Sequence, residues 1–368
     1  MRILCVTPSY PPRVGGGEKY AHRTNAEFVR QNMDVHVVTS VPGTSGQQTL
    51  DGVTIEYGRA PKCIGFPWFD PRVIAAALGR FKPQAVLAYG PSPYDPITAL
   101  FARRARVPFV QVYHADFNQR RFETRLATAV HNAVALRLAA AIVCTNEAMA
   151  RTLQARGFSG KIVVSPPGID ERFFSSRARG TGEDLLFVGA VDREHEYKRL
   201  DLLLDAVKAM VERDPRVALT VAGDGDRRPS FETMAHHLGI ADRVRFLGKI
   251  SDDALAELYR HARVLVLPSP TAQEGFGLVC LEAMACGLPV VCSACAGAAS
   301  LVGKAPGCAI WDGERIGSLI ESITAARQAT PAEREALGRY AENFTWKANA
   351  ERLIGELRKR NIVIDEPA

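Results

Sequence analysis

The sequence of 368 residues has no long apolar run, and this limits the kinds of protein it can be. No run reaches the ~18–20 consecutive apolar residues that a membrane-spanning helix needs. The opening residues MRILCVTPSYPP join one arginine and a short apolar run to a Pro/Gly loop. This pattern is typical of a first β-strand and not of a signal peptide.

The cysteines do not form a pattern that is typical of a metal site. The eight cysteines are scattered, and Cys292-Ser-Ala-Cys295 is the only CxxC sequence, with no second pair at zinc-finger spacing. Most lie in apolar segments, as small buried thiols do in a reducing compartment, so we expect a cytoplasmic protein. No RNA-binding signature is present, and nucleic acid is not an expected partner.

Charge is distributed unevenly along the chain. Residues 1–170 hold 20 Lys and Arg against 11 Asp and Glu, whereas the remainder holds 26 against 29. A basic first half beside a mildly acidic second half suggests that the first half meets something anionic. Arginines on solvated helix faces are the competing interpretation.

Short apolar segments alternate with helical patterns throughout the chain, which predicts two α/β domains of the doubly wound, parallel-sheet type. The expected strands of the first half are 3–7, 35–39, 53–57, 85–89, 109–113, 141–145 and 162–165. Those of the second half are 185–191, 217–223, 244–248, 264–269 and 288–293. Pro166-Pro167-Gly168 interrupts the pattern and indicates a linker.

The predicted domains are therefore 1–167 and 168–345, and the final helix, in about 346–368, is expected to pack back on the first domain. Tandem sheets of this type bind ligands at the carboxyl ends of their strands. The polar and glycine residues at those strand ends are accordingly the candidates for a functional site.

The stretch EGFGLVCLEAMACGLPVV, residues 274–291, follows such a strand end. Gly275 and Gly277 precede an apolar helix, where unpaired N–H groups and the helix dipole favour an anion such as a diphosphate. Glu274 would then face neutral hydroxyls that donate hydrogen bonds, and Glu282, more than one turn inside the helix, suits a ribose diol. The alternative is a capped helix with two solvated acids.

The same stretch closely resembles the EX7E region of the retaining GT-B glycosyltransferases of glycosyltransferase family four. Further segments resemble the family in the same order over nearly the whole chain: PPRVGGGEKYAHRTNAEFVRQNMDVHVVTS, VVSPPGIDERFF, LLFVGAVDREHEYKRLDLLLDAV, VAGDGD, VRFLGKIS and NFTWKANAERL. The resemblance implies two Rossmann-like domains facing across a cleft. It places a nucleotide sugar mostly in the second domain and the acceptor mostly in the first.

The resemblance also implies roles for individual residues. The reaction centre is expected to hold Glu274 at the donor-sugar hydroxyls, His114 near the sugar, and Lys198 at the diphosphate. The donor-binding residues are expected to be Gly16, Arg193, Gly275, Phe276, Gly277, Leu278 and Glu282. From the residues alone, the glycines at 15–17 could equally form a plain turn, His114 could be a structural hydrogen-bonder, and Lys198 could be a solvated lysine.

This chain departs from the family pattern at two places. An arginine usually follows the glycine of the strand at 185–191, but here Gly189 is followed by Ala190, so we expect Arg193, or else Arg199, to supply the cation. The loop AGAASLV after Cys295 lacks the glutamate that the family often carries. Asp224-Gly225-Asp226 spells DxD, but its place between a strand and a helix favours a turn over a metal site, and no metal or other cofactor is expected.

These observations predict a retaining, metal-independent hexosyltransferase that uses a UDP- or GDP-sugar and a hydroxyl acceptor, in cell-surface glycan or glycolipid assembly. A nucleotide-sugar 2-epimerase of the same fold and a noncatalytic sugar-nucleotide-binding protein remain alternatives. Segment 66–83 places three aromatic residues beside three cations: Trp68, Phe69 and Phe81 with Arg72, Arg80 and Lys82. Aromatics with flanking cations suit a headgroup interface, so an anionic membrane surface and a lipid-linked acceptor are further expected partners. A small-molecule or glycan acceptor is the alternative.

Overall fold

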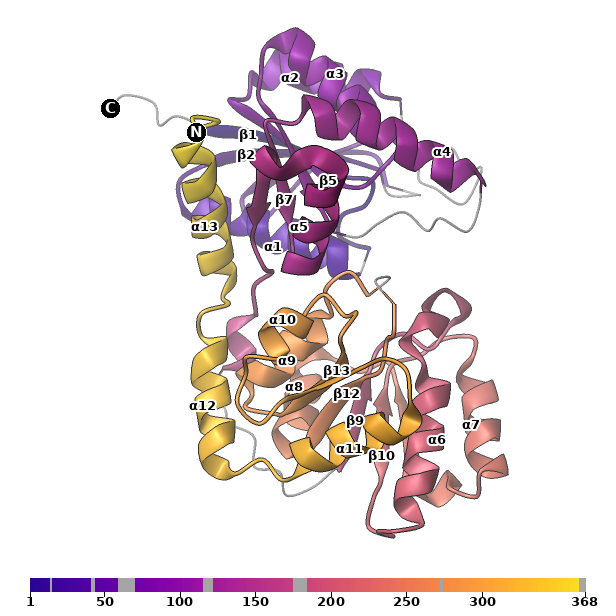
Figure 1. Ribbon diagram of the computed structural model, residues 1–368. Coiled ribbons are helices and arrows are strands. Elements are labelled where there is room, and N and C mark those ends of the chain that lie inside the picture. The colour runs from indigo at the N-terminus through magenta and orange to yellow at the C-terminus, as the bar shows by residue number, and fades with distance from the viewer. Residues whose placement is uncertain are drawn as a thin grey trace. The chain divides into compact units, whose positions relative to one another are not determined.

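The computed structural model describes residues 1–13, 15–40, 44–58, 70–114, 122–174, 184–271 and 274–363. The chain divides into two compact units, the first made of residues 1–168 with 346–368 and the second of residues 169–345. Each unit is built on one largely parallel sheet (Figure 1). None of the described helices is both long and apolar enough to cross a membrane.

The first unit contains an eight-stranded sheet in the order β3-β4-β2-β1-β5-β6-β7-β8, in which only β3 is antiparallel to its neighbour. Its strands are β1 (Arg2–Val6), β2 (Asp34–Thr39), β3 (Gly46–Leu50), β4 (Val53–Tyr57), β5 (Ala85–Gly90), β6 (Phe109–Tyr113), β7 (Ala141–Cys144) and β8 (Ile162–Val164). All of these strands except β3 were predicted from the sequence; the residues of β3, GQQTL, are all exposed and include only one apolar side chain.

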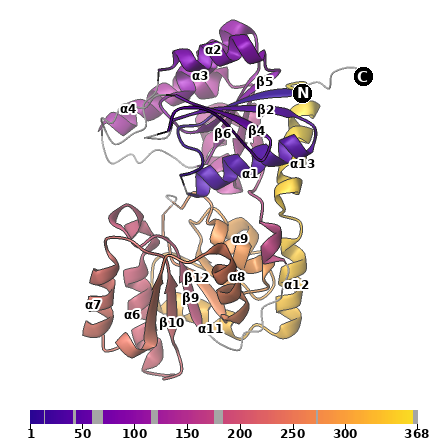
Figure 2. The ribbon, with the colours of Figure 1, turned by 180° about the vertical axis from the view of Figure 1, so that it is seen from behind.

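Helices cover both faces of this sheet (Figure 2). They are α1 (Gly16–Arg30), α2 (Arg72–Phe81), α3 (Asp95–Ala105), α4 (Phe122–His131), α5 (Glu147–Leu153) and α13 (Trp346–Lys359), with short turns η1 (Asn132–Leu136), η2 (Gln154–Phe158) and η3 (Ser159–Lys161). Helices α2, α3 and α5 and the turn η1 share one apolar core with the strands. Helix α1 packs along α13, the last helix of the chain.

A buried asparagine of α13 contributes hydrogen bonds that fasten this helix to the rest of the first unit. Asn349 is 1% exposed, and its amide nitrogen donates to the Pro166 carbonyl at 2.7 Å and to the Ser165 hydroxyl at 3.0 Å. Its amide oxygen accepts from the Thr24 hydroxyl of α1 at 3.0 Å. One asparagine therefore satisfies polar groups of α1 and of the segment after β8, which would otherwise be buried without partners.

The second unit contains a six-stranded, fully parallel sheet in the order β11-β10-β9-β12-β13-β14. Its strands are β9 (Leu185–Val188), β10 (Leu219–Ala222), β11 (Val244–Gly248), β12 (Val264–Leu267), β13 (Val290–Ser293) and β14 (Ala309–Trp311). Its helices are α6 (Leu200–Val211), α7 (Arg228–His237), α8 (Asp252–His261), α9 (Leu278–Ala285), α10 (Ala299–Val302), α11 (Ile316–Arg327) and α12 (Pro331–Ala341), with short turns η4 (Glu171–Phe173), η5 (Arg193–Lys198) and η6 (Ala241–Arg243).

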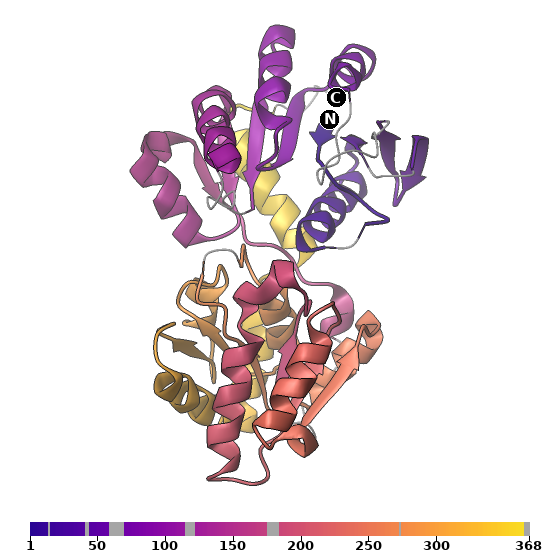
Figure 3. The same cartoon turned by 90° about the vertical axis from the view of Figure 1, so that its right-hand side faces the viewer.

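Side chains that alternate along the strands of this sheet feed two separate cores, and helices lie on both sides of it (Figure 3). Leu186 and Leu265 face the core that α8, α9 and α12 cover, whereas Phe187 and Val266 face the core of α6, α7 and α11. Because both faces of this parallel sheet are buried in apolar cores, polar functional residues are expected at the amino or carboxyl ends of its strands.

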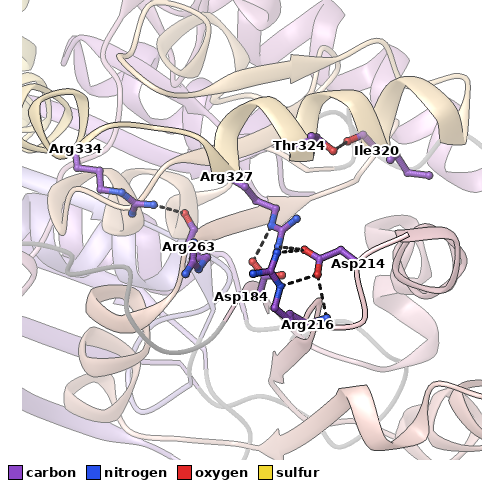
Figure 4. Close-up of polar contacts among 8 residues, drawn as sticks. All are labelled: Asp184, Asp214, Arg216, Arg263, Ile320, Thr324, Arg327 and Arg334. Atoms are coloured by element: carbon purple, nitrogen blue, oxygen red, sulfur yellow. Dashed lines mark hydrogen bonds and ion pairs between the residues drawn. The ribbon is translucent and has the colours of Figure 1, made fainter. Parts of the chain in front are cut away.

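An ion-pair network occupies the amino-terminal edge of this sheet (Figure 4). Arg327, at the end of α11, donates to Asp184 before β9 at 2.8 Å and to Asp214 before β10 at 3.3 Å. Hydrogen bonds from Arg216 and Arg327 lower the pKa of Asp214 to about 2, whereas burial raises the pKa of Asp184 against the nearby Arg327 charge. These pairs tie α11 to the sheet and give this edge a structural role.

We predict that Asn349→Ala lowers the free energy of unfolding of the first unit by about 2–4 kcal/mol, because it leaves several buried polar groups unpaired. Guanidinium-induced unfolding, followed by circular dichroism, measures the change. Asn343→Ala is the control, because Asn343 is exposed and makes one bond, to the Tyr340 carbonyl. A loss for Asn349→Ala no larger than that of the control would contradict the anchoring role.

Candidate functional site at the carboxyl edge

A buried ion pair lies at the carboxyl edge of the second unit. Lys198 ends the turn that follows β9, and Glu274 lies in the loop that follows β12. The Lys198 Nζ donates to the Glu274 Oε2 at 2.5 Å, and each residue is only 9% exposed. Because β9 and β12 are parallel neighbours, their carboxyl ends meet at one edge, which brings these residues together over 76 positions of sequence.

Glycines make room for this arrangement. A Cβ on Gly189, directly after β9, would lie 2.9 Å from the Lys198 Cδ, so the lysine stem passes over a position that admits no side chain. A Cβ on Gly223 would lie 1.8 Å from the Gly189 carbonyl oxygen, and one on Gly225 would lie 2.4 Å from the Val191 backbone. The backbone segments after β9 and β10 are thus in direct contact.

The start of α9 has no side-chain cap. Gly277 is the N-cap residue, with a left-handed φ of +87°, and as a glycine it supplies no side-chain hydrogen bond to the first N–H groups of the helix, which begins at Leu278. No acidic residue lies in its first turn. The dipole of this helix therefore presents partial positive charge that no side chain of its first turn neutralises.

Backbone hydrogen bonds from the loop after β13 hold the loop that leads into α9. The Gly297 N–H donates to the Glu274 carbonyl at 3.3 Å, and the Ala298 N–H donates to the Phe276 carbonyl at 2.8 Å. Phe276 is 8% exposed and belongs to the core, so it anchors the loop. The segment AGAASLV, which lacks the family's acid, therefore supports residues 274–276 through its backbone.

Glu282, the second predicted acid, lies on α9 and is 6% exposed. The hydroxyl of Tyr259, on α8, donates to the Glu282 Oε2 at 3.2 Å. Burial, and then the Glu282 carboxylate, raise the pKa of Tyr259 well above its ordinary value, which keeps the hydroxyl a donor. Tyr259 was not predicted as a site residue, because a tyrosine on an amphipathic helix is usually interpreted as a core residue.

The two candidate arginines are both paired with acids. The Arg193 Nε lies 3.3 Å from the Asp226 Oδ2, and this side chain is 78% exposed. The Arg199 Nε donates to both carboxylate oxygens of Asp201, at 3.0 and 3.1 Å. The choice between Arg193 and Arg199 as the replacement cation stays a prediction.

Both acids of the DGD sequence are engaged within the protein. Asp226 accepts from the Arg193 backbone N–H at 3.1 Å, and Asp224 accepts from the Gly225 N–H at 3.0 Å. In the part of the chain that the structure describes, no group of three or more His, Cys, Asp or Glu side chains could hold a metal ion. The seven described cysteines are free, and Cys292 is buried while Cys295 is exposed.

In the first unit, His114 follows β6 inside an aromatic enclosure. Its ring packs edge-on against Tyr20 of α1, with centroids 4.6 Å apart, and is parallel to Tyr89 at 6.1 Å. Trp346 of α13 packs in turn on Tyr20 at 5.8 Å. Burial lowers the pKa of His114 to about 4, against the opposing effect of the Asp95 carboxylate, and its Nε2 has no hydrogen-bonding partner among the described residues.

The buried carboxylate of Asp95 organises the segment before His114. It accepts from the Ser92 N–H at 2.8 Å and from Gln111 at 3.0 Å, and it contacts the His131 Nε2 at 3.1 Å. This fixes residues 90–95, where the Gly90 carbonyl accepts the backbone N–H of His114 at 3.0 Å. Asp95 was not predicted as a site residue, because a single acid at the start of a helix resembles an ordinary first-turn residue.

The glycines at 15–17 lie at the start of α1. Gly16 is the first residue of the helix, and its N-cap residue Gly15 supplies no side-chain cap. A Cβ on Gly15 would lie 2.3 Å from the Glu18 Oε2, at the end of a flexible side chain that can move away. A role for Gly16 at a diphosphate stays a prediction.

The segment proposed for a membrane contact is only partly described, since Trp68 and Phe69 lie outside the described residues. In α2, the apolar residues Ile74, Ala77 and Leu78 are buried in the core. Arg80 donates to both carboxylate oxygens of Glu56, at 2.7 and 2.9 Å. The described part of this segment therefore turns its apolar side inward.

Comparison with known proteins identifies the fold and the family. A sucrose-phosphate synthase from Thermosynechococcus elongatus superposes with a TM-score of 0.76 at 20% identity, over 98% of this chain and 99% of that one. The Anabaena protein HepE in complex with UDP-glucose superposes with a TM-score of 0.74 at 18% identity, over 98% of this chain and 100% of that one. The two units therefore have the GT-B fold, as the sequence predicted.

The family model "Glycosyltransferase Family 4" matches residues 14–173, and "Glycosyl transferases group 1" matches residues 168–344. The D-inositol 3-phosphate glycosyltransferase of Actinosynnema mirum is 35% identical over 214 residues, covering 53% of this chain and 51% of that protein. The chain spans about half the length of the curated relatives of this name. It belongs to the GT-B glycosyltransferases of family four, and neither family model supports an epimerase.

We predict that His114 stays neutral down to about pH 4 in the folded protein. Since an unfolded histidine protonates near pH 6.5, the unfolded state takes up the proton first, and stability is lost as the pH falls from about 6.5 to about 4. His114→Gln should lose less stability over this window. NMR titration of the ring and urea unfolding at several pH values measure both effects.

His237→Gln, which replaces an exposed histidine, is the control for this titration. A His114 ring that titrates near pH 6.5 would contradict the enclosure by Tyr20 and Tyr89.

Proposed function

We propose that the protein is a retaining hexosyltransferase that moves a sugar from a nucleotide sugar to a hydroxyl acceptor. The observation that carries this proposal is the buried Lys198–Glu274 pair at the carboxyl edge of the second sheet. Its carboxylate residue, Glu274, lies in the loop that leads into α9, whose N-cap residue is a glycine. A cation and a helix start suit a diphosphate, and a carboxylate beside them suits sugar hydroxyls.

Donor binding would rearrange this pair. A diphosphate oxygen and the Glu274 carboxylate compete for the same ammonium group, and the N–H groups at the start of α9 favour the diphosphate. Once Lys198 bonds to phosphate, the Glu274 oxygen becomes available to accept hydrogen bonds from the sugar. Glu282, held by Tyr259, is then the acceptor for the ribose hydroxyls.

The chemical step is a front-face displacement through an oxocarbenium-like state. The bond between the anomeric carbon and the diphosphate oxygen breaks, the acceptor oxygen bonds to the same face, and the leaving phosphate takes the proton of the acceptor. Stabilising the charge on the departing diphosphate is then the main task of the protein. Lys198, an arginine and backbone N–H groups would perform it without a metal ion. Neutral His114 would be a hydrogen-bonding group near the sugar.

A UDP-sugar or a GDP-sugar is the proposed donor. The HepE structure that resembles this chain holds UDP-glucose, which favours UDP. The acceptor would be a lipid-linked intermediate of surface-glycan assembly, reached by reversible binding to an anionic cytoplasmic membrane surface. A surplus of basic over acidic residues in 1–170 supports this acceptor, since each basic residue near such a surface adds about 1 kcal/mol.

We predict that the purified protein slowly hydrolyses one nucleotide sugar from a panel of UDP-, GDP-, dTDP- and ADP-sugars, and that the sugar is released first as the anomer of the donor. Proton NMR of the anomeric signals follows this reaction. EDTA should leave the rate unchanged, because cationic side chains and a helix start counter the diphosphate. Loss of activity with EDTA that Mg²⁺ or Mn²⁺ restores would contradict metal independence, and the inverted anomer would contradict retention.

We predict that Glu274→Gln lowers turnover by about 10²–10³-fold, on the order of 2–4 kcal/mol, while nucleotide binding survives. The reason is the loss of a charge-assisted hydrogen bond to the sugar that strengthens in the transition state. Turnover is measured by nucleotide release, and binding by calorimetry with the free nucleotide. Near-normal turnover would rule out this role.

The matched control for this variant is Glu212→Gln. Glu212 follows α6 in the same unit and pairs with Lys208 at 3.1 Å on the surface. It should keep full turnover. Thermal unfolding of both variants separates a loss of turnover from a loss of folding, because Glu274→Gln leaves the buried Lys198 without its carboxylate.

A further inference from the structure

Helices α3 and α4 of the first unit expose large apolar side chains to solvent. Leu100 of α3 is 50% exposed, and Leu126 and Val130 of α4 are 56% and 44% exposed. The two helices lie side by side in both views and are in contact (Figure 1, Figure 2). We call these three side chains and the helix surface around them the α3–α4 face. A solvent-exposed helix face is normally polar, so these exposed apolar side chains on two adjacent helices need an explanation.

The exposed side of α4 is a continuous apolar line. Leu126 and Val130 are one helical turn apart, and the exposed line continues through Ala133 of η1 to Arg137. The opposite side of the same segment is buried in the core, where Ala135 and Leu136 pack. The first unit covers this buried side, which also carries Thr128 and His131, whereas the apolar side chains of Leu126 and Val130 stay exposed.

Unpaired arginines border the α3–α4 face. Arg103, Arg104 and Arg106 are exposed at the end of α3, and Arg137 is exposed after η1. None of them forms an ion pair with any described residue. Neither 96–107 nor 126–140 contains an aspartate or a glutamate. The face therefore combines exposed apolar side chains with positive charge that no ion pair with a described residue compensates.

We propose that the α3–α4 face binds the headgroup–acyl boundary of a lipid bilayer that contains anionic lipids. Leu100, Leu126 and Val130 would enter the apolar layer, and the bordering arginines would meet the headgroup phosphates. This inference rests on the proposed function in one respect only: binding to the bilayer would bring the protein to a lipid-linked acceptor. It also moves the membrane contact away from α2, whose residues Ile74, Ala77 and Leu78 are buried.

A second copy of the chain is a poorer occupant. In a two-fold dimer the same patch meets itself, so the arginines of one copy would approach those of the other across the apolar centre. Like charges with no acid between them oppose such an interface. A soluble anionic acceptor would use the arginines but would leave the leucines in water.

The test is co-sedimentation of the full chain with vesicles of phosphatidylcholine alone or mixed with phosphatidylglycerol. The protein should bind the anionic vesicles at low salt, bind the neutral vesicles weakly, and dissociate at high salt. The double variant Leu126→Ser, Val130→Ser should bind the anionic vesicles about tenfold or more weakly, because two half-exposed apolar side chains no longer insert. Arg103→Gln, Arg104→Gln should weaken binding to a similar extent and reduce its dependence on salt.

The matched control is Leu50→Ser, which removes an exposed leucine from β3 of the same unit. It should bind as the unchanged protein does. No binding to anionic vesicles, or equal losses in Leu50→Ser and the α4 variant, would overturn the proposal. A dimer in analytical ultracentrifugation that the α4 variant abolishes would also overturn it, since the face would then belong to a second copy.

Donor hydrolysis separates this proposal from the proposed function. The α4 and arginine variants should hydrolyse the nucleotide sugar at the unchanged rate, because neither change touches the Lys198–Glu274 loops. Vesicle binding without any hydrolysis by the unchanged protein would contradict the proposed function and leave the α3–α4 face supported. Hydrolysis of the nucleotide sugar without vesicle binding would support the proposed function and contradict the role of the α3–α4 face.

Discussion

The buried pair of Lys198 and Glu274 is the interaction on which the candidate site depends. Removing two charges from water costs several kcal/mol for each ion, and only close pairing offsets that cost. The pair can form because Gly189 and Gly223 bring the segments after β9 and β10 into backbone contact and leave space for the lysine stem. A side chain at Gly189 would displace Lys198, and Glu274 would then be buried without its cation.

The same pair suggests how the site could respond to a donor. A buried ion pair is stable only while each ion has a partner, so a ligand that takes one ion must offer something to the other. A nucleotide sugar has both groups, since its diphosphate suits Lys198 and its hydroxyls suit Glu274. A nucleotide without a sugar would bind the lysine and leave the buried carboxylate without hydrogen-bond donors. Under the proposed function, this difference favours the complete donor over the product nucleotide.

Much of this arrangement could be predicted from the sequence, and the limits of prediction have physical causes. Buried parallel strands are strongly apolar, so β1, β5 and β9 were recognisable, whereas the polar strand β3 and the three-residue strand β14 had no comparable signal. The position of Glu274 beside a glycine-lined helix start was also readable. Its direct bond to Lys198 was not, because sequence patterns describe local geometry and that contact joins loops from two neighbouring strands.

The enclosure of His114 shows the same limit over a longer distance. The ring is packed by Tyr20, and Tyr20 is packed by Trp346, which begins the last helix more than 200 residues later in the chain. Asn349, one turn further on, bonds to Thr24 of α1, so the helix that carries Tyr20 is held by the end of the chain. The pKa of His114 is therefore a property of the completed first unit. A change in α13 that leaves the sheet intact would still alter the pKa of His114, because displacing Tyr20 would let water approach the ring.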